Sequence, residues 1–316
     1  MRTIKFRIKR FDGSKSWQQE YALPYENGRT MLWALTKIRE DLDPTFNFTS
    51  ACRHAICGSC AVKINGHSFL VCKTSLDEML EVFATDEIQL APLNNFRVIR
   101  DLVVDWRPKT VRIKAVKPWL IPTAAGRPEA GFIQPPTEFK AIASPTDCIQ
   151  CGICSSECEQ LAENSNFLDP FMLNRAYRFA VDSRDAAPEE HIKPAVDELW
   201  KCLHCHQCVT ACPKHIRLDR EIAYLRQESM HMGETANLGA RHAYAFHDDV
   251  RAKGRLNEMT LPLKTEGLVG TVTKRIPFAL RMVRRGKINP LSIPKAVHGI
   301  EGVRKLYAHV QEGQSK

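Results

Sequence analysis

Twelve cysteines constrain this chain more than any other feature of its sequence. All lie between Cys52 and Cys212, in three groups of four, and such groups serve either disulfide bonds or metal ligation. Disulfide scaffolds are small secreted chains with cysteine throughout, whereas this chain has 316 residues and its first residues lack the apolar run of a secretion signal. We therefore expect the cysteines to bind metal.

The first group has the spacing C-x4-C-x2-C, with a fourth cysteine further along. It consists of Cys52, Cys57, Cys60 and Cys72. This spacing is typical of plant-type [2Fe–2S] ferredoxins, where one loop supplies three thiolates and a hairpin strand behind it supplies the fourth. Gly58 lets the backbone N–H groups of the loop approach the sulfurs. Zinc sites prefer C-x2-C pairs, so the spacing favours a [2Fe–2S] cluster.

Each of the other two groups is a C-x2-C-x2-C-x3-C run. In two-cluster ferredoxins the fourth cysteine of each run ligates the cluster of the other run. The sequence therefore predicts one [4Fe–4S] cluster on Cys148, Cys151, Cys154 and Cys212. It predicts a second cluster on Cys158, Cys202, Cys205 and Cys208. Two zinc ribbons would need only pairs of cysteines and would leave the others unexplained.

Hydrophobic periodicity predicts a small sheet with one helix packed on it in the first third of the chain. Residues 3–10 alternate apolar and charged side chains, and a second strand follows around Tyr21. Thr30 can cap a helix, and Asn65-Gly66 between two short apolar runs is a strong hairpin signal. The predicted fold class is therefore α+β, with the sheet confined to residues 1–105.

Composition divides the rest of the chain into three parts. Residues 106–147 form a linker, because five prolines cannot all lie inside regular elements: Pro122, Pro128, Pro135, Pro136 and Pro145. Residues 148–240 show helical spacing and no β-rich stretch. Residues 241–316 are a basic extension without cysteine, with 15 Lys and Arg against 6 Asp and Glu.

Several segments beyond the cysteines match a known family. They are Ser50–Arg53, Ile56–Ala61, Asp101–Asp105, Lys117–Leu120 and Tyr177–Asp185. With the cysteines they make residues 1–240 resemble the iron–sulfur subunits of succinate dehydrogenase and fumarate reductase. The resemblance implies a β-grasp ferredoxin domain at 1–105, beside a flavoprotein subunit that carries FAD. It also implies an all-α dicluster ferredoxin domain at 148–240 near the membrane, and electron transfer between the flavin and a quinone.

Three features depart from the common pattern of that family. Most members have another residue in place of Cys205 and hold a [3Fe–4S] cluster there. The additional thiolate favours [4Fe–4S] and resembles the type-E enzymes, whose membrane subunits are related to heterodisulfide reductase. Residues 159–164 replace the Trp-containing segment that helps form the usual quinone site. Residues 284–291 resemble the end of a heterodisulfide reductase electron-transfer subunit.

The basic extension has two open roles. Its bulky apolar residues among arginines and lysines fit docking on a membrane surface or an acidic partner, or plain packing on the neighbouring domain, with Pro277 and Gly286 breaking any helix. No nucleic-acid-binding motif accompanies the charge, so we expect no nucleic-acid partner.

Charged residues beside the cysteines also have two readings. His204 and His206 either tune the third cluster or are surface histidines beside it. Arg53 either sets the potential of the first cluster or pairs with the flavoprotein. Arg184 with its acidic neighbours Asp182 and Asp185 is expected to stabilise the structure.

The sequence thus predicts an electron-transfer subunit of a succinate:quinone or quinol:fumarate oxidoreductase, without a substrate site of its own. An alternative is the iron–sulfur subunit of a thiol- or disulfide-linked fumarate reductase, and a more distant one is a zinc-bound interaction module. The expected partners are a flavoprotein subunit and a membrane-anchor or heterodisulfide-reductase-like subunit, with a quinone nearby. We expect a peripheral complex on the cytoplasmic face of the membrane, with the periplasmic face as the alternative.

Overall fold

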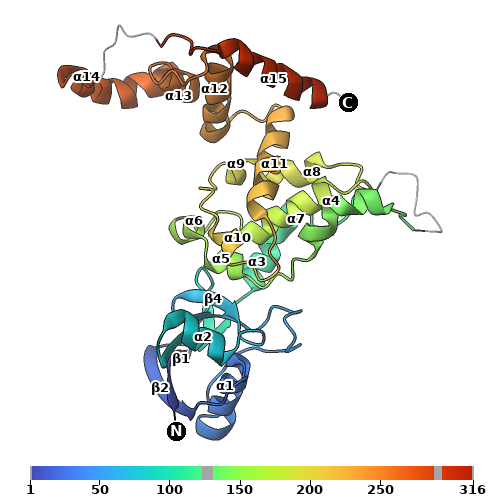
Figure 1. Ribbon diagram of the computed structural model, residues 1–316, viewed down its shortest axis with the longest axis vertical. Coiled ribbons are helices and arrows are strands. Elements are labelled where there is room, and N and C mark those ends of the chain that lie inside the picture. Colours follow the sequence, from blue (N-terminus) through green and yellow to red (C-terminus); the bar gives the residue numbers. More distant parts are fainter. Residues whose placement is uncertain (1, 123–130, 288–293, 315–316) are drawn as a thin grey trace. The chain divides into compact units, whose positions relative to one another are not determined.

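The computed structural model describes residues 2–122, 131–287 and 294–314. It divides into two compact units, residues 1–228 and 229–316. The first unit contains a β-sheet part followed by a helical part, and all twelve cysteines lie in it (Figure 1).

The β-sheet part is built on one five-stranded sheet. In sheet order its strands are β2 (Ser16–Pro24), β1 (Thr3–Phe11), β5 (Glu87–Ala91), β3 (Ala61–Ile64) and β4 (His67–Leu70). Strand β1 is antiparallel to β2 and parallel to β5, and β3 is antiparallel to both of its neighbours. This mixed order is the expected β-grasp arrangement.

Local sequence signals explain the elements around this sheet. The Asn65-Gly66 turn joins β3 to β4 with both residues at positive φ, as a two-residue hairpin requires. Thr30 caps α1 (Met31–Lys37) by accepting a hydrogen bond from the Trp33 amide at 3.2 Å. Helix α1 and helix α2 (Leu76–Phe83) bury their apolar faces in the same core as the sheet.

A short hairpin and a series of short helices form the rest of the first unit. They are β6 (Val98–Arg100), β7 (Val103–Val104), α3 (Arg107–Arg112), α4 (Pro136–Thr146), α5 (Ile153–Ser156), α6 (Glu159–Glu163), α7 (Pro170–Ala180), α8 (Glu189–Ile192), α9 (Val196–Leu199), α10 (Gln207–Thr210) and α11 (Leu218–His231). The last of these helices continues three residues into the second unit.

Helix α4 lies where the sequence predicts an irregular linker. Pro135 and Pro136 stand at its start, where a missing N–H costs no hydrogen bond, and Pro145 lies in its last turn. The prolines therefore mark the ends of a helix instead of excluding one. Pro122 lies outside regular elements as predicted, and Pro128 lies outside the described residues.

The sheet part and the helical part of the first unit share one core. Gly58, in the first cysteine loop, packs on the backbone of Cys151, and a Cβ at this glycine would lie 2.6 Å from the Cys151 Cβ. Asn95 donates from its side chain to the carbonyls of Ser155 and Cys158, at 2.8 and 3.0 Å. These contacts hold the first cysteine loop against the second.

The regular elements in the described part of the second unit are all helices. Its helices are α12 (Leu238–Lys253), α13 (Leu261–Gly270), α14 (Ile276–Arg284) and α15 (Ile300–Gln314). Gly267 interrupts α13, and from Leu268 the chain is helical to the end of α14 through a π-helical turn at 271–275. Pro277 lies in the first turn of α14, just after the π-helical turn, and Gly286 follows the end of α14, so the helical path continues past Pro277.

The contact at Gly58 generates a stability prediction. In Gly58→Ala the positive φ of 72° costs about 1 kcal/mol, and the clash with Cys151 adds about 1–3 kcal/mol. Gly66→Ala is the matched control, since its φ is 88° but no atom lies within 4 Å of an added Cβ. We expect denaturant unfolding to show a clearly larger loss for Gly58→Ala. Equal losses for the two variants would contradict the close contact.

Candidate metal centres

The first predicted ligand set lies in one loop and the adjacent hairpin. Cys52 and Cys57 are in the loop, Cys60 directly precedes β3, and Cys72 lies two residues after the end of β4. The sulfurs of Cys60 and Cys72 lie 3.3 Å apart. The structure therefore gathers the four predicted thiols, three from the loop and one from behind it.

Backbone N–H groups point at the sulfurs of this loop. The amides of His54, Ile56 and Cys57 donate to the Cys52 sulfur at 3.3–3.4 Å, and the amide of Ala55 donates to the Cys72 sulfur at 3.2 Å. Left-handed backbone turns such as that at Ala55, with φ of 55°, turn these N–H groups inward. Such donors stabilise negative charge on sulfur, which is what a thiolate-bound cluster needs.

The thiols of this loop differ in their environment. Hydrogen bonding to the Ser59 hydroxyl and to Cys52 lowers the pKa of the exposed Cys57 thiol to about 6. Burial raises the pKa of the Cys60 thiol to about 12. The loop therefore has an exposed, easily ionised side and a buried side.

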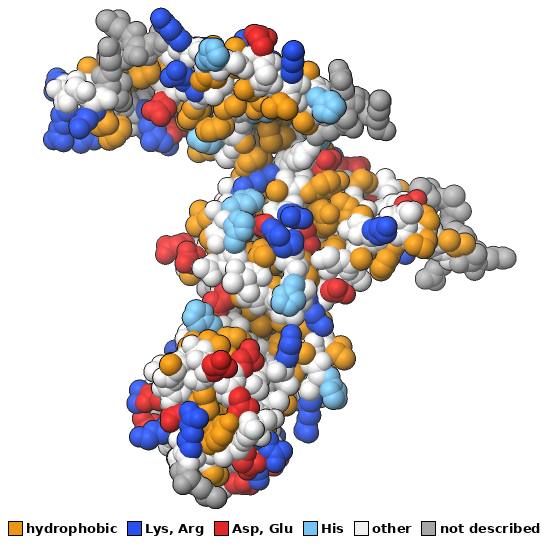
Figure 2. Space-filling model, in the orientation of Figure 1, with side chains coloured by type: hydrophobic (Ala, Val, Ile, Leu, Met, Phe, Trp, Pro, Cys, Tyr) orange, Lys and Arg blue, Asp and Glu red, His pale blue; other side chains and the backbone are white. Residues whose placement is uncertain are grey.

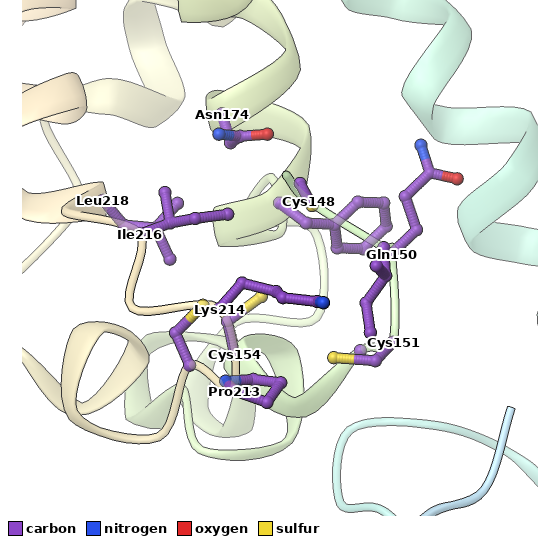
Figure 3. Close-up of a pocket in the computed structure, with 13 residues that line it drawn as sticks. Cys148, Gln150, Cys151, Cys154, Asn174, Pro213, Lys214, Ile216 and Leu218 are labelled. Atoms are coloured by element: carbon purple, nitrogen blue, oxygen red, sulfur yellow. The ribbon is translucent and has the colours of Figure 1, made fainter. Parts of the chain in front are cut away.

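The second predicted set lines a mainly apolar cavity of about 380 Å³ (Figure 3). Cys148 and Cys151 come from the loop before α5, Cys154 lies in α5, and Cys212 follows α10. Apolar residues complete the wall, namely Ile149, Phe171, Pro213, Ile216 and Leu218.

The third predicted set lines a cavity of about 480 Å³. Cys202, Cys205 and Cys208 belong to the second run, and Cys158 reaches this cavity from the first run. Cys205 is exposed, but it lines the cavity together with the other three. Cys158 of the first run thus lines the cavity of the second run, and Cys212 of the second run lines the cavity of the first, which is the placement that the crossover rule describes.

The two runs share one backbone path. The residue before the second cysteine has φ of 52° in both runs, at Gln150 and at His204. The residue after the second cysteine is again left-handed, at Gly152 and at His206. A Cβ at Gly152 would lie 2.7 Å from the Phe96 ring, so glycine is required there, whereas the exposed His206 side chain has room.

Two arginines that the sequence analysis did not single out hold the first cysteine of each run. Arg175 donates to the Cys148 carbonyl at 2.7 Å, and Arg226 donates to the Cys202 carbonyl at the same distance. Arg226 also lies over the Trp200 ring, 5.0 Å from its centroid. No signal in the sequence distinguishes Arg175, because Asn174 and Arg178 in the same helix are also polar.

The other charged residues have separate environments. His204 lines the third cavity, and burial lowers its pKa. His206 is exposed, 3.8 Å from Asp219. Arg184 pairs with Asp182 at 2.7 Å as predicted, whereas Asp185 accepts a hydrogen bond from the Ile121 amide and contacts the His191 ring.

The donor set fits iron–sulfur clusters. Burial raises the pKa of Cys151 and Cys208 to about 12 and that of Cys158 to about 11, so their thiolates require strong positive charge beside them. Among the described residues, no three His, Cys, Asp or Glu side chains form a group suited to a single metal ion. The helical part instead spreads four sulfurs around each cavity, which suits a polynuclear cluster.

Comparison with known families agrees with this division. The model of a 2Fe-2S iron-sulfur cluster binding domain matches residues 5–110, and that of a 4Fe-4S dicluster domain matches residues 144–216. In the structure of the Mycobacterium smegmatis Sdh1 complex in the apo form, a chain 21% identical superposes with a TM-score of 0.67. That match covers 73% of this chain and 96% of the other, and it shows the shared fold.

Sequence similarity to two iron–sulfur subunits identifies the family of this chain. The 8-methylmenaquinol:fumarate reductase iron-sulfur subunit of Wolinella succinogenes is 45% identical over 296 residues, which cover 92% of either chain. The fumarate reductase iron-sulfur subunit of Mycobacterium tuberculosis is 37% identical over 63% of this chain and 80% of its own. The chain therefore belongs to the family of iron–sulfur, electron-transfer subunits of fumarate reductase and succinate dehydrogenase.

Proposed function

We propose that this chain carries electrons between a quinol and a flavoprotein subunit with FAD that reduces fumarate. The observation that carries the proposal is the gathering of all twelve cysteines into three sets, two of which exchange their fourth member. The name of the Wolinella relative supports a menaquinol-type donor and fumarate as the acceptor. The reverse direction, succinate oxidation, uses the same residues.

The ligands follow from the three sets. The first set would hold a [2Fe–2S] cluster through Cys52, Cys57, Cys60 and Cys72. The second set would hold a [4Fe–4S] cluster through Cys148, Cys151, Cys154 and Cys212. Bound iron–sulfur clusters accept and release single electrons. The chain itself supplies N–H donors to the sulfurs, excludes water from the buried thiols, and keeps Gly58 in contact with Cys151 between the first two sites.

We assign a [4Fe–4S] cluster to the third set because Cys205 lines its cavity with Cys158, Cys202 and Cys208. The alternative is a [3Fe–4S] cluster held by Cys158, Cys202 and Cys208 without Cys205. An oxidised [3Fe–4S] cluster is paramagnetic, whereas oxidised [2Fe–2S] and [4Fe–4S] clusters give no signal in electron paramagnetic resonance (EPR). EPR therefore separates the two assignments.

The test uses the whole complex, purified anaerobically and oxidised. We expect about ten iron atoms for each copy of this chain and no EPR signal from a three-iron cluster. Cys205→Ala is expected to produce such a signal at close to one spin per chain. Leu203→Ala, at the neighbouring exposed residue of the same cavity, is the control and stays silent. A stoichiometric signal in the wild-type complex would contradict the role of Cys205, and zinc in place of iron would overturn the electron relay.

The second unit supports a proposal for the membrane-side partner. Exposed hydrophobic and basic side chains occur together on the second unit (Figure 2). In the helical stretch after Gly267, a row of exposed apolar residues consists of Leu268, Val269, Val272, Ile276, Leu280 and Val283. Basic side chains flank this row, namely Lys274, Arg275, Arg281, Arg284, Arg285 and Lys287. We name residues 268–287 the basic helical segment.

The comparisons show that relatives differ in how much of this chain they match. The Wolinella subunit matches 92% of this chain and so extends into the second unit, whereas the Mycobacterium tuberculosis and Escherichia coli subunits match only 63% and 62%. The segment therefore belongs to a subgroup of the family. We propose that it docks on an acidic surface of a heterodisulfide-reductase-like membrane subunit, which keeps the complex peripheral to the membrane. The cytoplasmic face stays a prediction, and no described helix is both long and apolar enough to cross a bilayer.

Charge reversal tests this docking. In the triple variant Arg281→Glu, Arg284→Glu and Arg285→Glu, we expect the membrane subunit to be lost during purification while the flavoprotein stays bound. The matched control reverses Arg251, Lys253 and Arg255 at the end of α12. Retention of the membrane subunit by the first variant would contradict the proposal. If the variant complex stays intact, and the isolated wild-type chain binds anionic vesicles, the partner of the segment is lipid instead.

The alternative function is fumarate reduction with thiols as the electron donor. The similarity of residues 284–291 to a heterodisulfide reductase subunit favours it, although residues 288–291 lie outside the described part of the chain. Reduction of the oxidised complex by a menaquinol analogue but not by coenzyme-type thiols would support the quinol reading. The opposite result would support the alternative.

A further inference from the structure

A buried amide faces the cavity of the second cysteine set without a full complement of hydrogen bonds. Asn174, on α7, is completely buried and lines the cavity that Cys148 also lines (Figure 3). Its Nδ2 donates to both carboxylate oxygens of Glu221, at 3.0 and 3.2 Å. Its Oδ1 has no hydrogen-bond partner. An unpaired buried amide oxygen retains its desolvation penalty, so this oxygen calls for a physical explanation.

Glu221, which accepts the hydrogen bonds of this amide, is also buried. It lies on α11 with 5% of its surface exposed. The charged and titratable groups that act on it are Arg175 and Tyr177 of α7, Asp219 of its own helix, and the Cys148 thiol. Burial raises the pKa of Glu221 to about 7, although the hydrogen bonds from Asn174 oppose the rise. Both protonation states are therefore accessible near neutral pH.

We propose that Asn174 and Glu221 form a two-position hydrogen-bond switch that tunes the reduction potential of the cluster in this cavity. This inference rests on the [4Fe–4S] cluster proposed there. Neither residue is a ligand or a catalytic residue. Asn174 is a positioning residue that presents one side of its amide to the cavity. Glu221 decides which side it presents.

The two positions follow from hydrogen-bonding capacity. An ionised Glu221 only accepts hydrogen bonds, so the amide turns its NH₂ to the carboxylate and its oxygen stays unpaired, as in the structure. A protonated Glu221 can donate to Oδ1 of Asn174. The amide then turns over, and its NH₂ faces the cavity, where it can donate to a sulfur.

The second position favours the reduced cluster. A hydrogen bond to sulfur stabilises added negative charge, and so does the proton held on Glu221. Reduction by one electron and uptake of one proton by Glu221 therefore promote each other. The midpoint potential should fall as the pH rises through about 7. The limit is about 59 mV for each pH unit, because a pH unit is a tenfold change in proton activity and one electron is transferred.

The experiment is a redox titration of the intact complex from pH 6 to pH 9, followed by EPR of the cluster on Cys148, Cys151, Cys154 and Cys212, whose signal is resolved from that of the third set. We expect a pH-dependent potential in the wild-type complex and in the control Glu163→Gln, which makes the same change at an exposed residue of α6. We expect a pH-independent potential in Glu221→Gln, because a glutamine side chain pairs with the Asn174 amide without titrating. In Asn174→Leu the slope should fall by more than half.

Two further measurements keep the result interpretable. If Asn174→Leu does not fold, the double variant Asn174→Leu, Glu221→Leu removes both polar partners together and is expected to keep its cluster with a flat potential. Electron–nuclear double resonance of the reduced wild-type cluster after exchange into D₂O should detect a deuteron near the cluster at pH 6 and lose it at pH 9.

The outcomes separate the two proposals. A wild-type potential that does not change with pH overturns the switch, and so does a full slope in Asn174→Leu, since Glu221 would then act without the amide. A complex that lacks the signal of the cluster on Cys148, Cys151, Cys154 and Cys212 would instead contradict the proposed function of the second cysteine set.

Discussion

The exchange of one cysteine between the two helical runs is the constraint on which the rest of the helical part depends. Cys158 leaves the first run for the third cavity, and Cys212 leaves the second run for the second cavity. Neither run completes a set of four thiols alone. The two runs must therefore pack together for either cavity to close. The short helices α5 and α10 each add one cysteine to one cavity, Cys154 to the second set and Cys208 to the third.

The repeated backbone of the two runs shows how this exchange is built. Left-handed residues flank the second cysteine of each run, and an arginine from a following helix holds the carbonyl of the first. Around this common frame the two sites diverge. Gly152 is confined between aromatic rings, whereas His206 and Cys205 are exposed. One site is therefore buried inside the chain and the other is open to a partner or to solvent.

Local signals and motif rules made much of this predictable from the sequence. Asn65-Gly66 specifies its hairpin and Thr30 caps its helix through neighbours in the chain. The cysteine pairing follows a rule of spacing that needs no knowledge of packing. Helix α4 differs from the prediction because Pro135 and Pro136 stand at its start, where proline costs no hydrogen bond, and Pro145 lies only in its last turn. The Asn174–Glu221 pair was invisible because its members are 47 residues apart and only the packing of α7 on α11 brings them together.

The unequal burial of the cysteines has a consequence for how the protein matures. Cys154 is buried in the core of the helical part, whereas Cys57 lies on the surface of its loop. Iron and sulfide can reach Cys154 only before α5 packs on its neighbours, or through a local opening of the helical part. The loop around Cys57 stays accessible after folding. The centre in the β-sheet part therefore keeps one face, at Cys57, that can be reached after folding, although Cys60 on its other side is as buried as Cys154.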